Sequence, residues 1–151
     1  MIASDFLSFL ALASTAVLAS PIRNETELVE RQLRNWNCGG TQYTTAQVQA
    51  AWNNAIHLTV TGGTIQRGSS EYPHEFRNGQ AGNPEVDPSP CAGLTLREFP
   101  ILASGALYTG GDPKTDRVVY GSSDPNNGVW EECFLMTHTG ARARNLFVKC
   151  T

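Results

Sequence analysis

A single segment of the sequence has the pattern of a helix, and this constrains the fold more than any other feature. The segment TTAQVQAAWNNAIHL spans residues 44–58. Thr44 and Gln47 form a capping-box pattern at its start. After Thr59, glycine, proline, asparagine and aspartate break the chain into short β-prone runs. Apolar residues recur through the segment at the spacing of one buried helical face: Val48, Ala51, Trp52 and Ala55.

One helix followed by several short strands predicts an α+β domain, with one N-terminal helix packed on a central antiparallel β-sheet. The other face of the sheet would then be free for a site. Residues 77–93 and 121–128 are rich in turn-forming residues and are predicted loops, of which the first is long enough to carry function. The runs expected to form strands are 63–67, 72–76, 96–102, 117–120, 133–137 and 146–149.

The N-terminus has the features of a secretion signal. An apolar run from Phe6 to Leu18 is followed by small residues, and Val17 and Ala19 stand where a signal peptidase would require them. The alternative is a buried N-terminal helix. We expect residues 1–20 to be a signal peptide, residues 21–34 a polar pro-segment, and residues 35–151 a secreted domain. No stretch is long and apolar enough to suggest a membrane span.

The predicted domain contains all four cysteines, Cys38, Cys91, Cys133 and Cys150. An even count behind a secretion signal indicates two disulfides, although four cysteines allow three pairings. Zinc is the competing interpretation, but no pair has the CxxC or CxxH spacing of a zinc site. We therefore predict neither a metal nor a cofactor. The formal net charge of −3 excludes a general nucleic-acid-coating protein, so any RNA or DNA function must rest on a local site.

Two of the three histidines lie in predicted strand regions. His57 falls near the end of the helix, where a histidine usually complements the helix dipole, and we assign it no catalytic role. His74 and His138 could each be structural. Because side chains alternate along strands, however, Glu98, Arg117 and His138 can share one face of the sheet. A carboxylate, imidazoles and a guanidinium are the groups needed to cleave a phosphodiester with the ribose hydroxyl of the substrate as nucleophile.

The motifs YPHEF, EFPIL, SGALYTGGDPKTDRVVY, THTGA and NLFVKCT resemble, in this order, the successive motifs of the fungal guanyl-specific ribonuclease family. The resemblance runs from NCGGTQYTTAQVQAA to the C-terminus and so covers the whole predicted domain. It implies the same helix-on-sheet fold and a metal-free endoribonuclease that acts on single-stranded RNA. The expected reaction is transesterification to a 2′,3′-cyclic phosphate, followed by hydrolysis of that ester.

The resemblance also implies roles for five side chains. Glu98 is similar to the family's general base and His138 to its general acid. His74 would assist the base and stabilise charge. Arg117 would contact the phosphate, and Tyr72 would donate a hydrogen bond to it.

Base recognition is where the sequence departs from the family. The guanyl enzymes have a tyrosine and a glutamate where this chain has Gly79 and Gln80, and glutamine cannot accept two guanine N–H groups as a carboxylate does. Glu85 could replace that carboxylate if the loop folds back, as in the purine-preferring branch. We expect a guanine preference that is relaxed toward purines. The residues expected to bind substrate are Phe76, Asn78, Gln80, Glu85, Asn145 and Phe147.

The resemblance implies the disulfide pairing Cys38 with Cys150 and Cys91 with Cys133, and a cis bond between Tyr72 and Pro73. The segment FRNGQAGN is also similar to the ribotoxins, relatives that cut one ribosomal RNA loop. Their long lysine-rich loop is replaced here by a short acidic one. A ribotoxin-like or RNA-binding effector protein on the same scaffold is therefore the alternative to a monomeric secreted ribonuclease.

The sequence GARARN departs from the family as well, since it places Arg142 and Arg144 where small residues are usual. The two arginines belong either to a solvated loop or to additional contacts with substrate phosphates.

Overall fold

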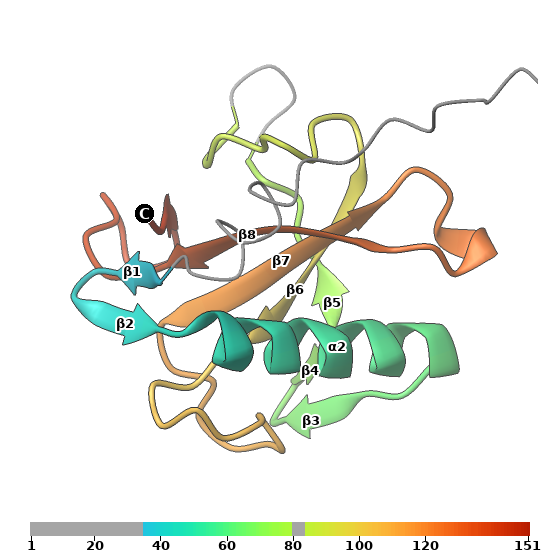
Figure 1. Cartoon of the computed structure of the whole chain (residues 1–151), viewed down its shortest axis with the longest axis horizontal. Helices are drawn as coiled ribbons and strands as arrows, with labels where there is room; N and C mark the ends of the chain where they lie inside the picture. The colour runs from blue at the N-terminus through green and yellow to red at the C-terminus, as the bar shows by residue number, and fades with distance from the viewer. Residues whose placement is uncertain (1–34, 80–83) are drawn as a thin grey trace, which may run out of the picture.

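The computed structural model describes residues 35–79 and 84–151. The predicted signal peptide, the predicted pro-segment and Gln80 lie outside the described residues. Within them the chain forms one α-helix and nine strands, arranged as an α+β domain in which the helix packs across an antiparallel sheet, as predicted (Figure 1).

Helix α2 (Thr45–Thr61) buries the four apolar residues expected from the sequence. The capping box at Thr44 is present, with the Thr44 side chain accepting from the Gln47 amide and the Gln47 side chain accepting from the Thr44 amide. The helix continues three residues beyond the predicted segment, because Gly62, rather than Thr59, ends it in the left-handed conformation at φ 71°. His57 is consequently one turn from the end, and it is exposed.

Five strands form the main sheet in the order β5–β6–β7–β8–β9, and every neighbouring pair is antiparallel. The run predicted over residues 72–76 is divided at Pro73, which lacks a backbone N–H to donate to a strand partner. The predicted cis bond between Tyr72 and Pro73 is present. The strands are β5 (His74–Glu75), β6 (Thr95–Pro100), β7 (Asp116–Ser122), β8 (Glu131–Thr137) and β9 (Val148–Lys149).

Two short hairpins and one turn of 3₁₀ helix complete the fold. Strand β1 (Trp36–Cys38) pairs with β2 (Thr41–Tyr43), and β3 (Ile65–Arg67) pairs with β4 (Ser70–Tyr72). The β1–β2 hairpin was not predicted, because strands of three residues are too short to show an alternating pattern. The 3₁₀ helix η1 (Pro125–Asn127) lies in the predicted 121–128 loop.

Apolar side chains pack on both faces of the main sheet. On the helix side, Trp52 of α2 packs in a cluster with Phe99 and Val118, and its indole N–H donates to the Val119 carbonyl at 2.9 Å. That carbonyl lies at a bulge, where the register between β7 and β8 shifts between Val119 and Tyr120. On the other face, a second cluster contains Phe76, Val86, Leu96, Val119, Phe134 and Met136.

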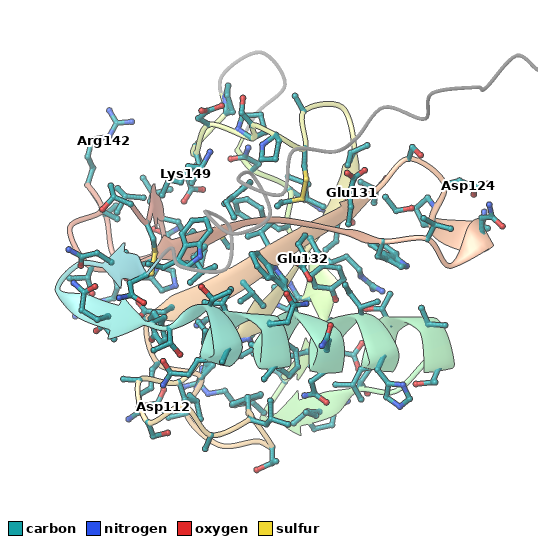
Figure 2. The ribbon with its side chains drawn as sticks, in the orientation of Figure 1. Asp112, Asp124, Glu131, Glu132, Arg142 and Lys149 are labelled. Carbon is teal, nitrogen blue, oxygen red and sulfur yellow. A yellow bond between two sulfur atoms is a disulfide. The ribbon has the colours of Figure 1, made fainter. Side chains whose placement is uncertain are left out.

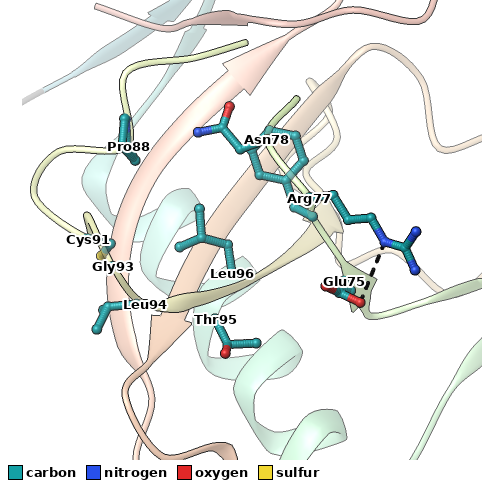
Figure 3. Close-up of a pocket in the computed structure, with 10 residues that line it drawn as sticks. Glu75, Arg77, Asn78, Pro88, Cys91, Gly93, Leu94, Thr95 and Leu96 are labelled. Atoms are coloured by element: carbon teal, nitrogen blue, oxygen red, sulfur yellow. Dashed lines mark ion pairs between the residues drawn. The ribbon is translucent and has the colours of Figure 1, made fainter. Parts of the chain in front are cut away.

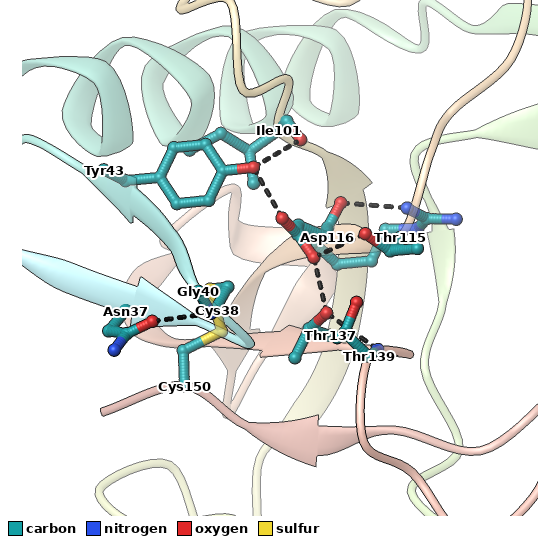
Figure 4. The surroundings of a disulfide bond; sticks show 11 residues. Asn37, Cys38, Gly40, Tyr43, Ile101, Thr115, Asp116, Thr137, Thr139 and Cys150 are labelled. Carbon is teal, nitrogen blue, oxygen red and sulfur yellow. Dashed lines mark hydrogen bonds between the residues drawn. A yellow bond between two sulfur atoms is a disulfide. The ribbon is translucent and has the colours of Figure 1, made fainter.

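A buried carboxylate is hydrogen-bonded to several elements near the N-terminal end of α2 (Figure 4). Asp116 of β7 accepts from the Tyr43 hydroxyl at 2.6 Å, from Thr115 at 2.8 Å and from Thr137 at 2.5 Å. Asp116 is only 3% exposed. Burial, together with this hydrogen bond, raises the pKa of Tyr43 far above its ordinary value.

The two disulfides have the predicted pairing. Cys38 of β1 is bonded to Cys150 with a Cα–Cα distance of 4.6 Å, and Cys91 is bonded to Cys133 of β8 with a distance of 5.7 Å. The first bond holds the β1–β2 hairpin beside the C-terminus, where the Asn37 amide also donates to the Thr151 carbonyl. Among the described residues, no helix is long and apolar enough to span a bilayer.

Candidate active site

The register of the sheet brings the predicted catalytic side chains to the face opposite α2. Glu98 of β6 pairs with His74 of β5 on one side and with Val119 of β7 on the other. Directly paired residues point to the same face of a sheet, and so do residues two apart along a strand. Arg117, two residues before Val119, therefore shares this face with Glu98 and His74.

His138 lies on this face as well. Arg117 pairs with Met136, which lies two residues before His138 along the chain. His138 follows the last residue of β8, and its amide donates to the Thr115 carbonyl at 3.0 Å, so the strand direction is maintained. The prediction that Glu98, Arg117 and His138 share one face is thus consistent with the observed register.

Glu98 and His74 form a close acid–base pair. His74 Nε2 lies 3.1 Å from Glu98 Oε1, and the Glu98 side chain is 7% exposed whereas that of His74 is 39% exposed. Burial raises the pKa of the Glu98 carboxyl above its ordinary value. The positive charges of His74 and Arg117 oppose this rise, and the negative charge of Glu85 adds to it.

The two ring nitrogens of His74 face different acceptors. Nδ1 is 3.0 Å from the Glu75 carbonyl oxygen, which can only accept, so this contact is a hydrogen bond in the tautomer that has its proton on Nδ1. Nε2 is 3.1 Å from Glu98 Oε1. A proton on Nε2 would therefore lie against the carboxylate, and the imidazolium form of His74 would pair with it.

The guanidinium group of Arg117 is oriented by hydrogen bonds to other residues of the protein. One guanidinium nitrogen, Nη1, donates to the carbonyl oxygens of Pro113, Lys114 and Asp116 at 2.9 to 3.0 Å. The other, Nη2, donates to the Tyr72 hydroxyl at 3.2 Å. Arg117 is 4% exposed, so it is a buried cation of fixed orientation.

Two buried polar atoms of this site have no hydrogen-bond partner in the described part of the chain: Glu98 Oε2 and Arg117 Nε. Buried polar groups nearly always have partners, and exceptions cluster at functional sites. An acceptor and a donor of this kind, on one face of the sheet, match the hydroxyl and phosphate oxygen of a phosphodiester.

His138 is oriented by the loop that follows it. Nδ1 lies 2.7 Å from the Leu146 carbonyl and must donate to it, which leaves Nε2 as the nitrogen available to a substrate. The imidazole stacks on the Phe147 ring, with centroids 3.8 Å apart and an interplanar angle of 26°. The guanidinium carbon of Arg117 lies 5.9 Å from the centre of the same ring, so Phe147 lies beside both the predicted acid and the fixed cation.

The expected base-recognition residues are partly assembled. Phe76 is 8% exposed and meets Phe147 edge-on at a centroid distance of 5.9 Å. Asn78, at φ 43°, clamps the returning loop, because its side chain both donates to the Val86 carbonyl at 2.7 Å and accepts from the Val86 amide at 2.8 Å. Asn145 is exposed and forms no hydrogen bond with the other base-recognition residues that the structure describes.

Glu85 is brought back to the site by this clamp. Its amide donates to the Asn78 carbonyl at 3.4 Å, and its carboxylate accepts from the Phe147 amide. A carboxylate thus lies beside Phe147 and close enough to Glu98 to affect the pKa of that group. Glu85 therefore lies where it could replace the carboxylate that the family has at the position of Gln80.

A pocket of about 480 Å³ lies next to the base-recognition segment (Figure 3). Its walls include Phe76, Asn78 and Leu96, and Arg77 forms an ion pair with Glu75 at 3.8 Å at its edge. None of the predicted catalytic side chains lines it. The catalytic groups lie on the face of the sheet opposite α2 and outside this pocket, so the pocket is a neighbour of the site and not the site itself.

Asp116 was not among the predicted site residues, but its hydrogen bonds position residues of the site. Its carbonyl holds Arg117, and its carboxylate holds Thr137, whose hydroxyl in turn accepts from the Thr139 amide at 3.0 Å. These residues flank His138 on both sides. Asp116 is the first residue of β7, between Thr115 and Arg117, and lies just outside the predicted strand 117–120, so no sequence pattern marked it as buried. No group of three metal-ligating side chains occurs within residues 35–79 and 84–151.

The fold and the arrangement of side chains define a small disulfide-bonded α+β protein with an acid–base site on the face of its sheet opposite α2. The profile of the ribonuclease family matches residues 31–151. The chain therefore belongs to the ribonuclease family.

Its relatives are fungal enzymes. The chain is 40% identical over 115 residues to guanyl-specific ribonuclease U1 of Ustilago sphaerogena, covering 76% of this chain and 93% of the relative. It is 36% identical over 151 residues to guanyl-specific ribonuclease T1 of Aspergillus oryzae, covering 100% of both. It is 39% identical over 113 residues to guanyl-specific ribonuclease Pc of Penicillium chrysogenum, covering 75% of this chain and 94% of the relative.

Proposed function

We propose that this chain is an endoribonuclease that cleaves single-stranded RNA on the 3′ side of guanosine by acid–base chemistry. The observation that carries the proposal is the shared face of the sheet, on which the Glu98–His74 pair, the fixed Arg117 cation and His138 lie together. Family membership and the names of the relatives support the same activity. Those names give no support to the ribotoxin alternative.

In the first step, Glu98 removes the proton from the ribose 2′-OH, and the freed oxygen attacks the adjacent phosphorus. His138 Nε2 donates a proton to the departing 5′-oxygen. The bond between phosphorus and that oxygen breaks, which leaves a 2′,3′-cyclic phosphate and a free 5′-hydroxyl. Arg117, Tyr72 and the His74 cation stabilise the negative charge that develops on the phosphoryl oxygens.

In the second step the two roles are exchanged. His138, now without its proton, activates water, and the protonated Glu98 returns its proton to the 2′-oxygen as the cyclic ester opens. A raised pKa suits Glu98 to this alternation, because a group that both accepts and donates a proton works best when its pKa is near the operating pH.

We propose that the Glu85 carboxylate binds the guanine base, because Gln80 has no carboxylate to do so. A carboxylate beside Phe147 can accept the two N–H groups of a guanine edge, and adenine offers it only one donor group there. Phe76 would supply the aromatic wall and Asn78 the loop geometry, and Asn145 and Phe147 would complete the site. Because this carboxylate also accepts from the Phe147 amide, guanine has to share or replace that bond. We therefore expect a guanine preference with some cleavage after adenosine.

Two disulfides in a domain of this size are typical of proteins that leave the reducing cytosol. We propose that the enzyme acts outside the cell as a monomer, after loss of residues 1–20 as signal peptide and 21–34 as pro-segment. Sequencing the N-terminus of the secreted protein would check this; a mature chain that still contained residues 1–20 would contradict it.

Cleavage of the dinucleoside phosphates GpU, ApU and UpU tests the specificity. We expect kcat/KM to fall in that order, and the Glu85→Gln variant to lose most of the difference between GpU and ApU. Equal rates on all three substrates would overturn the proposed specificity. A Glu85→Gln variant with unchanged discrimination would remove Glu85 from the account.

A further inference from the structure

The loop of residues 139–146 is fixed to the predicted general acid. His138 Nδ1 donates to the Leu146 carbonyl at 2.7 Å, and the Ala141 amide donates to the His138 carbonyl at 3.2 Å. The Leu146 amide also donates to the Ala143 carbonyl at 3.0 Å. The loop therefore has a defined position relative to the imidazole.

This 139–146 loop carries two arginines that the rest of the described chain does not neutralise. Arg142 and Arg144 are both exposed, and within residues 35–79 and 84–151 neither forms an ion pair or hydrogen bond. Figure 2 shows Arg142 extending away from the body of the molecule. Four other cations have carboxylate partners: Arg67 and Lys114 with Asp112, Arg77 with Glu75, and Lys149 with Asp87. Half-buried Arg97 instead lies over the Trp130 ring, at 5.9 Å from its centre.

The charge of this loop contrasts with that of the molecule. The whole chain has a formal net charge of −3, but residues 139–146 include no acidic side chain. On the base-recognition side, the 84–88 segment carries Glu85 and Asp87. Two unpaired guanidinium groups beside the acid thus form a local positive site in an otherwise acidic protein.

The chemistry fixes which part of an RNA chain passes this loop. The general acid must contact the departing 5′-oxygen, so the nucleoside 3′ of the scissile phosphate lies next to His138. The next phosphates continue away from that nucleoside. Since the loop begins and ends at contacts with His138, it is a part of the protein that the leaving side of the substrate can reach.

We propose that Arg142 and Arg144 form a subsite for the RNA phosphates immediately 3′ of the leaving nucleoside. The inference rests on the acid role proposed for His138. The subsite accelerates cleavage of polymeric RNA and adds nothing to reactions that have no downstream phosphate. It therefore gives this chain a preference for internal cleavage over cleavage of dinucleotides.

The test compares GpUpUpU, which has two phosphates beyond the leaving nucleoside, with GpU, which has none. Each phosphate contact in a single strand contributes about 0.7 to the slope of log affinity against log salt, so two contribute about 1.4. We expect wild-type kcat/KM on GpUpUpU to fall about sevenfold more between 50 and 200 mM salt than that of Arg142→Ala/Arg144→Ala. At low salt this double variant should also lose the preference for GpUpUpU over GpU.

Three comparisons make the test specific. Hydrolysis of guanosine 2′,3′-cyclic phosphate, which has no leaving nucleoside, reports whether the double variant is folded and catalytically competent. The variant Arg67→Ala/Arg97→Ala has the same change in charge away from the loop and should keep the GpUpUpU preference, because Arg97 faces Trp130 on the helix side of the sheet. Arg142→Lys/Arg144→Lys keeps the charge and should keep most of the salt dependence.

An unchanged GpUpUpU preference and salt slope in the double alanine variant would overturn the subsite while leaving the proposed function intact. An equal loss in the Arg67→Ala/Arg97→Ala control would overturn it as well, because net charge rather than position would then be responsible. Failure of the wild type to cleave GpU would contradict the proposed function itself, and the subsite with it.

Discussion

Two opposing influences act on the carboxyl group of Glu98. Burial raises its pKa, and the charges of His74 and Arg117 lower it, with burial dominating. The hydrogen bonds agree with this balance, because Glu98 Oε2 has no partner and the Nη1 and Nη2 atoms of Arg117 donate to three carbonyls and the Tyr72 hydroxyl rather than to Glu98. The site thus keeps a carboxylate that is costly to bury, in a position where it can take a proton.

Removing the positive charge of His74 should make Glu98 a weaker acid. In His74→Ala the pKa of Glu98 rises further, so the carboxylate form needed for catalysis is reached only at higher pH. The acidic limb of the kcat/KM profile on GpU should therefore move to higher pH, with a lower maximum because charge stabilisation is also lost. If the pH at which kcat/KM rises were unchanged in His74→Ala, His74 would not influence the pKa of Glu98.

Replacing Glu98 by glutamine should stabilise the fold at neutral pH while slowing cleavage by about 10² to 10⁴-fold. Because the folded-state pKa is raised above the ordinary 4.5, ionisation of Glu98 opposes folding, and this cost grows as the pH rises through the folded value. Urea unfolding should show a higher free energy of unfolding for Glu98→Gln at neutral pH. The difference should disappear below the ordinary pKa, where both states of the wild type hold the proton. A variant less stable than the wild type at neutral pH would mean that the carboxylate contributes net stability.

At the scale of elements, the sequence predicted the parts that have strong periodicity. The buried face of α2 was predictable because its apolar residues repeat at helical spacing, and strands β6, β7 and β8 because each is a short β-prone run bounded by turn residues. The β1–β2 hairpin was not, because three-residue strands have no period. The pairing of His74 with Glu98 depends on strand register across a long loop, which composition alone does not determine, so their 3.1 Å contact emerged only from the structure.

Helix α2 is joined to the catalytic sheet by several hydrogen bonds, which include one between Thr59 and the Tyr120 hydroxyl and one from the Trp52 indole. The indole N–H of Trp52 donates to the carbonyl of Val119, at the bulge between β7 and β8. Trp52→Phe removes this donor and leaves a buried carbonyl without it, which should cost about 1–3 kcal/mol of unfolding free energy. Thermal or urea unfolding measures the loss, and a change in stability smaller than a few tenths of a kcal/mol would show that another donor satisfies Val119.

At the scale of the whole molecule, the two disulfides restrict the unfolded chain to different extents. Cys38 and Cys150 are 112 residues apart, whereas Cys91 and Cys133 are 42 apart. The loop-closure model assigns about 5 kcal/mol to the first bond and about 4 kcal/mol to the second. Cys38→Ala/Cys150→Ala should therefore be less stable in urea than Cys91→Ala/Cys133→Ala. The reverse order would indicate that local packing around Cys91, and not chain entropy, dominates.

The central claim is that a metal-free acid–base site of Glu98 and His138 cleaves RNA. It is tested most directly by digestion of single-stranded RNA in excess EDTA, with the wild type beside Glu98→Ala and His138→Ala. The wild type should retain full activity and release fragments that end in guanosine 2′,3′-cyclic phosphate, and each variant should be slower by about 10² to 10⁴-fold. Loss of wild-type activity in EDTA would contradict the mechanism, as would full activity in either variant.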